Sequence, residues 1–103
     1  IGNEFHYALY APNPERRWKL NPYMASSKDI DFARKFIAWN TCKFGIQRVD
    51  ACSLYDVTLL LMELEDYNPF LSLDLVDPII KERFLESLCV SLEALIQEKR
   101  HPA

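Results

Sequence analysis

The stretch that decides the fold is Ser53-Leu-Tyr-Asp-Val-Thr-Leu-Leu-Leu-Met-Glu-Leu-Glu-Asp-Tyr67, which is largely apolar and contains neither glycine nor proline. Wound as a helix, it carries apolar side chains around nearly the whole circumference, and Asp56 and Glu63, one heptad apart, mark its polar side. Ser53 and Asp56 have the spacing of a capping box, and Asn68-Pro69 ends the segment. The pattern therefore predicts a central helix over 53–67.

Two further helices are predicted on either side of this one. The segment 27–44 follows Ser26, which forms a capping-box pattern with Asp29, and places its apolar side chains on about half of the circumference before Gly45 ends it. The segment 78–99 begins with Asp77-Pro78, an N-cap carboxylate followed by proline at the first helical position. Residues 46–50 are left as a short connection.

The amino-terminal residues have a different periodicity. Residues 4–10 alternate between apolar and polar side chains, which is typical of a strand, and Pro12 and Pro14 stop it. Residues 16–20 can return as a second short strand, so 4–20 is predicted to be a strand or hairpin. The fold class expected is mainly α, a three-helix core with this short hairpin attached, in one domain spanning 1–103. An α+β fold is the alternative.

Composition limits the class and the compartment. Of the 103 residues, 50% are hydrophobic and 13% aromatic, which is enough material for a core. The longest apolar run, Leu59–Met62, is far shorter than the roughly 20 residues of a membrane span, so no membrane partner is expected. The three cysteines are an odd number and lie in or beside apolar segments, which favours reduced, mostly buried thiols in a cytoplasmic protein.

The net charge of −3 is unevenly distributed. Residues 1–48 carry eight basic and four acidic side chains, whereas residues 49–80 carry seven acidic side chains and no basic one. Nucleic-acid affinity depends on clustered cations, so a nucleic-acid partner is not expected overall. Either the two halves of the chain complement each other within the fold, or Asp56, Glu63 and Asp66 form an acidic face for a basic protein partner.

Reactive constellations are absent from the sequence. Two glycines cannot build a phosphate-binding loop, and no G-x-S-x-G motif is present. Cys42, Cys52 and Cys89 lack the close pairing of zinc ligands. No catalytic residue, metal or cofactor is therefore predicted, and a non-enzymatic role is favoured.

One basic cluster remains, formed by Arg16, Arg17, Trp18 and Lys19. Arginine and tryptophan are enriched at protein interfaces, and a basic run that contains an aromatic residue can also hold a nucleic acid. In a third interpretation, Trp18 closes the edge of the core, and its arginine neighbours lie in water or pair with the acidic middle segment.

The leading interpretation rests on surplus apolar surface on the second and third predicted helices, on the acidic stretch 49–80 and on the missing catalytic constellation. Leu85, Leu88, Leu92 and Leu95 recur at three-four-three spacing and predict self-association. We expect a non-catalytic protein-interaction module that forms a homo-oligomer: a small regulator, adaptor, inhibitor or immunity-type protein. The alternatives are a nucleic-acid accessory protein that uses residues 16–19, and a small enzyme or ligand carrier built around His6, Tyr7 and Tyr10.

Overall fold

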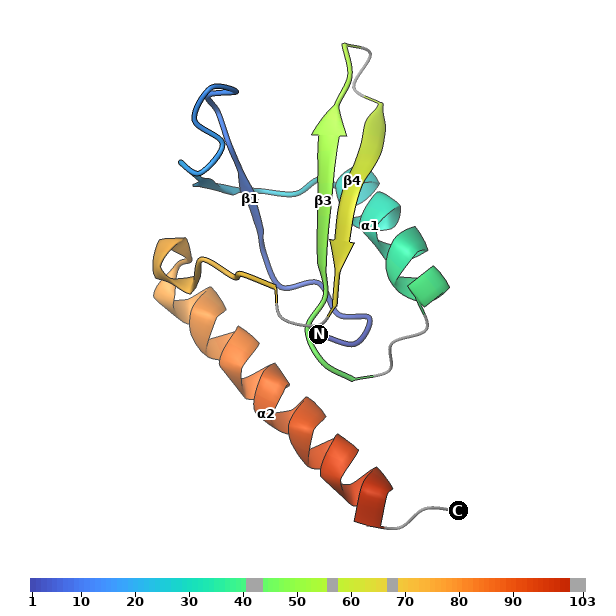
Figure 1. Cartoon of the computed structure of the whole chain (residues 1–103). Coiled ribbons are helices and arrows are strands. Elements are labelled where there is room, and N and C mark those ends of the chain that lie inside the picture. The colour runs from blue at the N-terminus through green and yellow to red at the C-terminus, as the bar shows by residue number, and fades with distance from the viewer. Residues whose placement is uncertain (41–43, 56–57, 67–68, 101–103) are drawn as a thin grey trace.

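The computed structural model describes residues 1–40, 44–55, 58–66 and 69–100 (Figure 1). Strands β1 (Ala8–Tyr10) and β2 (Asn21–Tyr23) precede helix α1 (Ser27–Asn40). Strands β3 (Arg48–Ser53) and β4 (Leu59–Glu65) follow, and then the 3₁₀ turn η1 (Leu73–Leu75) and helix α2 (Pro78–Arg100). The strands form two separate antiparallel pairs, β1 with β2 and β3 with β4. The chain therefore has an α+β fold, and the predicted three-helix core is wrong.

The error lies in the segment 53–67: among its described residues, Ser53 ends β3 and Leu59–Glu65 form β4, and none of them is helical. Its partner strand begins at Arg48, in the segment that the sequence pattern left as a connection. Val49 pairs with Leu64 and Ala51 with Leu61. A short run that is apolar at nearly every position has neither helical nor strand periodicity, so its structure depends on the pairing that the rest of the chain offers.

The pairing of β3 with β4 contains one irregularity. Asp50 pairs with Glu63 and Ala51 with Leu61, so Met62 is an extra residue on β4, as in a β-bulge. One face of this hairpin is approached by α1, mainly through β4 (Figure 1).

The amino-terminal ribbon is shorter than expected and uses a different second strand. Leu9 pairs with Pro22 and Tyr10 with Asn21, so the returning strand lies after the segment 16–20. Proline is tolerated here because β2 is an edge strand, in which one backbone N–H need not donate a hydrogen bond to a neighbouring strand. The rings of Tyr10 and Tyr23 lie 5.7 Å apart between centroids across the ribbon.

Both helices begin where their capping residues predict. Asp29 accepts a hydrogen bond from the Ser26 backbone N–H at 2.8 Å, and Ser26 Oγ accepts one from the Asp29 N–H at 3.2 Å, which confirms the capping box. Asp77 Oδ1 caps α2 by accepting from the Ile79 N–H at 2.9 Å. Of the predicted carboxyl end of the first helix, residues 41–43 lie outside the described residues, and Gly45 has a positive φ of 94°.

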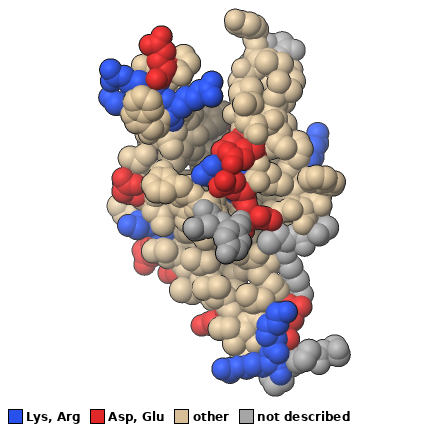
Figure 2. Space-filling model, in the orientation of Figure 1, with Lys and Arg blue, Asp and Glu red and all other residues tan. Residues whose placement is uncertain are grey.

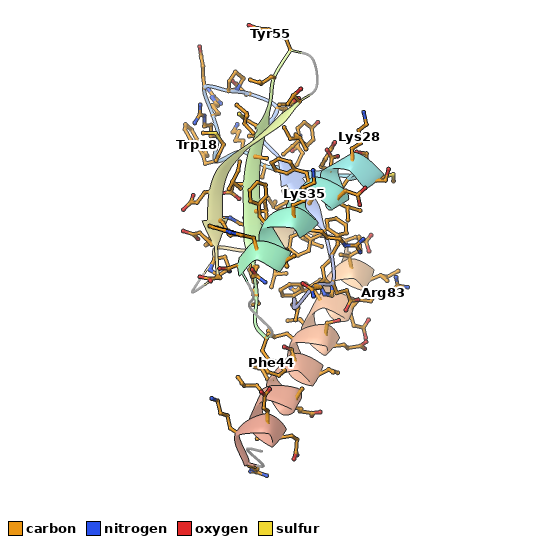
Figure 3. The ribbon with its side chains drawn as sticks, turned by 90° about the vertical axis from the view of Figure 1, so that its right-hand side faces the viewer. Trp18, Lys28, Lys35, Phe44, Tyr55 and Arg83 are labelled. Atoms are coloured by element: carbon orange, nitrogen blue, oxygen red, sulfur yellow. The ribbon has the colours of Figure 1, made fainter. Side chains whose placement is uncertain are left out.

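The described side chains form only a small buried core. Within the described ranges, Val76 and Phe84 are the buried apolar residues. The Phe84 ring packs edge-on against His6 at 5.3 Å and Tyr7 at 5.7 Å, and the Tyr7 hydroxyl donates to the Leu71 carbonyl at 2.6 Å. These contacts attach the first half of α2 to the amino-terminal segment, whereas the second half extends away from both hairpins (Figures 1 and 3).

The resulting molecule is elongated and has a large surface. Its radius of gyration is 14.9 Å, with principal extents of 49 × 29 × 22 Å, whereas a compact domain of this length has a radius of gyration of about 13 Å. The accessible surface is 8165 Å², and a compact monomer of this mass exposes about 6,000 Å². Roughly 2,000 Å² more surface thus meets solvent than compact folding would leave. In the described part of the chain, neither helix has the length and apolarity to cross a bilayer.

Candidate interaction surface

Helix α2 carries a continuous apolar stripe on its exposed side. Leu85, Leu92 and Ile96 are 41%, 47% and 49% exposed, and the Cys89 side chain between them is also exposed. The four residues are spaced by four, three and four positions, which places them within about 60° of one another on the helix. We call these four residues the α2 stripe. This spacing is that of the seam of a coiled coil.

The structure divides the four leucines that the sequence singled out. Leu85 and Leu92 belong to the α2 stripe. Leu88 and Leu95 are half-buried and lie on the neighbouring face of the helix, on the side of the buried Phe84. Sequence reasoning missed Cys89 and Ile96 as members of the exposed set. The four-three-four spacing was visible in the sequence, but the side of α2 that meets solvent was not.

Three acidic residues of the middle segment lie beside a cation of their own chain. Arg48 donates to both carboxylate oxygens of Asp50, at 2.8 and 2.9 Å, and to the Phe70 carbonyl at 3.0 Å. Its guanidinium also lies 3.8 Å from Glu63 and 3.7 Å from Glu65. Near the centre of the face drawn in Figure 2, acidic side chains (red) gather beside a basic group (blue).

The pKa values in this cluster follow from these contacts. The hydrogen bonds to Asp50 raise the pKa of Arg48, although partial burial opposes the shift. The pKa of Glu63 is raised, mainly because its carboxyl hydrogen-bonds to Glu65 and is repelled by the charge there. The cluster therefore holds more negative charge than Arg48 neutralises.

The three predicted acidic contact residues fall in different surroundings. Glu63 lies on β4 beside Arg48 and Glu65, and Asp66 accepts a hydrogen bond from Asn40 Nδ2 at 2.9 Å. Asp56 lies outside the described residues. Both described carboxylates thus interact with neighbours in the same chain, Glu63 with a cation and Asp66 with a neutral amide.

The basic cluster lies in the loop between β1 and β2. Arg16, Arg17 and Lys19 are exposed, and backbone bonds from Arg16 to the Asn13 carbonyl at 2.9 Å and from Lys19 to the Arg16 carbonyl at 3.0 Å form its turns. Figure 2 shows the cations grouped at the upper left, and Figure 3 shows Trp18 near the same end. Trp18 is 74% exposed, so it does not close the edge of the core.

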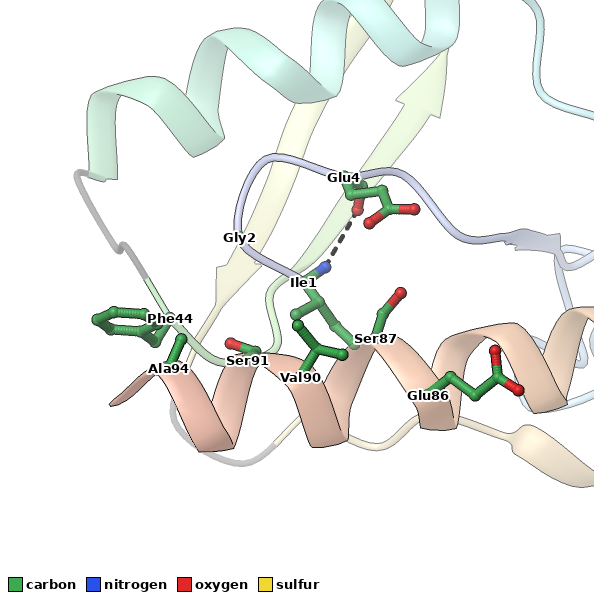
Figure 4. Close-up of a pocket in the computed structure, with 9 residues that line it drawn as sticks. All are labelled: Ile1, Gly2, Glu4, Phe44, Glu86, Ser87, Val90, Ser91 and Ala94. Carbon is green, nitrogen blue, oxygen red and sulfur yellow. Dashed lines mark hydrogen bonds between the residues drawn. The ribbon is translucent and has the colours of Figure 1, made fainter. Parts of the chain in front are cut away.

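A shallow groove lies between the amino terminus and α2 (Figure 4). It has a volume of about 440 Å³, and the residues with polar side chains that line it are Glu4, Glu86, Ser87 and Ser91. The Ser91 hydroxyl is already an acceptor for the Gly45 N–H at 3.4 Å. None of His6, Tyr7 and Tyr10 lines this groove, so it does not support a ligand site built on those rings.

His6 packs into the small core instead. Its Nε2 is shielded from solvent, has no hydrogen-bond partner among the described residues, and lies 3.9 Å from a Glu4 carboxylate oxygen. Burial lowers the pKa of His6, the α-ammonium of Ile1 lowers it further, and Glu4 opposes the shift. The neutral imidazole is therefore the form that this packing favours.

The cysteines differ from the sequence prediction. Cys52 on β3 and Cys89 on α2 are free and exposed rather than buried, and Cys42 lies outside the described residues. Among the residues that the structure describes, no group of three or more histidine, cysteine or carboxylate side chains is arranged to hold a metal ion.

Comparisons with known proteins add no assignment. No family model, curated protein or solved structure matches the chain.

Proposed function

We propose that this chain is a non-catalytic protein-interaction module that buries its α2 stripe against another polypeptide. The observation that carries the proposal is the exposure of Leu85, Leu92 and Ile96 in one row along α2. Single exposed apolar residues are ordinary on protein surfaces, but a contiguous row at coiled-coil spacing is typical of a contact site.

The size of the accessible surface supports the same proposal. The excess of roughly 2,000 Å² over a compact monomer is larger than the ~800 Å² that one partner buries in an interface of standard size. Two fully buried apolar side chains in the described ranges are few for a domain of this length, so one chain buries less apolar surface than a compact domain does. Contact with a second polypeptide would supply the missing burial.

The acidic residues of the middle segment contribute less to this proposal. Arg48 binds Asp50 and lies within 4 Å of Glu63 and Glu65, so part of their charge is compensated before any partner arrives. A basic partner would compete with Arg48 for these carboxylates. The stripe, by contrast, has no such competitor among the described residues.

The two exposed cysteines give a direct test. Cys89 lies in the α2 stripe and Cys52 lies on β3, so the rate of maleimide labelling at Cys89 relative to Cys52 reports whether the stripe is covered. In cells that produce the protein, we expect Cys89 to be labelled at least about tenfold more slowly than Cys52. In highly diluted purified protein, both should react at similar rates.

The matched control is a substitution within the stripe. Leu92→Glu places a charge beside Cys89 and should restore its labelling in cells, whereas Val90→Glu, at a position that is 66% exposed on another face of α2, should not. Equal labelling of Cys89 and Cys52 in cells would show that the stripe stays open and would refute the proposed function.

A further inference from the structure

We infer that the partner of the α2 stripe is a second copy of the same chain, paired through α2 in antiparallel orientation. This inference rests on the proposed function and names its partner. It is based on the order of side chains along α2. When two copies of the helix run antiparallel, apolar side chains of one lie opposite apolar side chains of the other, and the charged ones at the two ends of the stripe lie opposite residues of the other sign.

The alignment of two antiparallel copies follows from the stripe. When Leu85 of one copy lies opposite Ile96 of the other, Cys89 lies opposite Leu92, and each layer combines the two kinds of seam position, as antiparallel coiled coils require. The four layers are then Leu–Ile, Cys–Leu, Leu–Cys and Ile–Leu. All of their members are exposed in the single chain, so pairing requires no rearrangement of its core.

The seam positions beyond the apolar layers are charged. The row continues at both ends of the stripe: Glu82 lies three residues before Leu85, near the start of α2, and Lys99 lies three residues after Ile96, near its end. Both side chains are exposed. In the antiparallel alignment, Glu82 of each copy lies opposite Lys99 of the other, which places an attractive charge pair at both ends of the seam. A parallel alignment would place Glu82 against Glu82 and Lys99 against Lys99, so the charges favour the antiparallel form.

One edge of the seam opposes the pairing and makes the inference testable. Glu86 and Glu93 lie on the same side of the stripe, and in the antiparallel pair Glu86 of one copy faces Glu93 of the other. Such like-charge neighbours weaken association modestly. A basic partner helix would instead be attracted by both carboxylates, so changing their charge distinguishes the two occupants.

The first experiment is sedimentation of the purified chain across the micromolar range. We expect a concentration-dependent dimer of the wild type, and a dissociation constant more than about a hundredfold weaker for Leu92→Glu, because two apolar contacts are lost and two charges are buried. Val90→Glu is the matched control and should dimerise as the wild type does. Far-UV circular dichroism of both variants confirms that the monomer stays folded.

The second experiment uses the charges. Glu93→Lys should tighten the dimer roughly fivefold, since two repulsive pairs become attractive. Glu82→Lys should weaken it, and Lys99→Glu in the same chain should restore it. A parallel pair predicts no such rescue, and a basic partner predicts that Glu93→Lys weakens binding.

The outcomes separate this inference from the proposed function. A wild type that stays monomeric across the micromolar range, or a dimer that Leu92→Glu and Val90→Glu weaken equally, would overturn antiparallel self-pairing. If Cys89 is nevertheless protected in cells, a different polypeptide covers the stripe and the interaction module stands. If Cys89 is unprotected as well, both proposals fail.

Discussion

Among the described residues, Phe84 is the one whose truncation we expect to destabilise the fold most. Its ring is 3% exposed and packs against His6 and Tyr7, which lie far from it in the sequence. We expect Phe84→Ala to lower the free energy of unfolding by about 3–5 kcal/mol. The substitution leaves a cavity, and it removes the ring contacts that attach α2 to the amino-terminal segment. Urea unfolding at fixed protein concentration measures the change.

The control for this prediction is an exposed residue on the same helix. Val90→Ala removes a smaller apolar side chain that already meets solvent, and it should change the free energy of unfolding by less than about 0.5 kcal/mol. A loss of similar size in both variants would mean that the Phe84 contacts carry no special share of the stability.

His6 makes the stability depend on pH in a defined direction. Burial, with a smaller contribution from the Ile1 ammonium, lowers the pKa of His6 in the folded chain below its ordinary value of 6.5, and the Glu4 carboxylate opposes this. The unfolded chain therefore takes up the proton first as pH falls. We expect the contribution of neutral His6 to stability to be complete above pH 6.5 and to decline as pH falls toward the lowered pKa.

The measurement is urea unfolding over the range from pH 7.5 to 5, and the comparison is His6→Gln. Glutamine has no titrating proton, so this variant should show a flatter pH profile even if its overall stability differs. Identical profiles for the two proteins would show that another group produces the pH dependence.

At the scale of the elements, the cap of α2 is the clearest case in which sequence and structure agree. Asp77 accepts the Ile79 N–H at 2.9 Å, as the Asp-Pro pair predicts. We expect Asp77→Ala to lower the free energy of unfolding by about 1 kcal/mol and Asp77→Asn, which keeps a capping oxygen, to cost much less. Thermal unfolding compares them, and an equal loss in both variants would contradict a capping role.

The sequence predicted elements with local signals and failed where the structure depends on long-range pairing. The caps at Ser26 and Asp77 are local, and both helices begin there. The segment 53–67 is apolar at too many positions to show a period, and its strand partner begins at Arg48 in a segment without a distinctive pattern. The structure of this segment depends on the difference in free energy between a hairpin and a helix. The periodicity of the sequence gives no measure of that difference.

The candidate surface was predictable to a similar degree. The apolar repeat of α2 could be read from its sequence, and Leu85 and Leu92 are indeed exposed. Leu88 is half-buried because Phe84 turns that side of the helix toward the amino-terminal segment. Such contacts between distant residues determine which of the two apolar rows of the helix meets solvent. The exposed row could therefore not be predicted from the sequence.

At the scale of the whole molecule, the charge distribution disfavours nucleic acid. The exposed cations at Arg16, Arg17 and Lys19 are few, and the chain carries a net charge of −3. We expect mixed-sequence oligonucleotides to bind no more tightly than about 100 μM at physiological salt, since affinity of this kind comes from neutralised phosphates. Fluorescence anisotropy across a salt series tests this, and micromolar binding with a steep salt dependence would favour the loop as a nucleic-acid site.

The stability of the whole molecule should also depend on protein concentration. A chain that exposes 8165 Å² and fully buries two apolar side chains in its described ranges leaves much apolar surface that a second copy could cover. If two copies unfold together, each tenfold increase in concentration stabilises the folded dimer by about 1.4 kcal/mol. We therefore expect the thermal midpoint of the wild type to rise steadily with concentration and that of Leu92→Glu to stay constant. A wild-type midpoint that does not change would show that the single chain is stable with its large surface exposed, because mass action would then play no part in its folding.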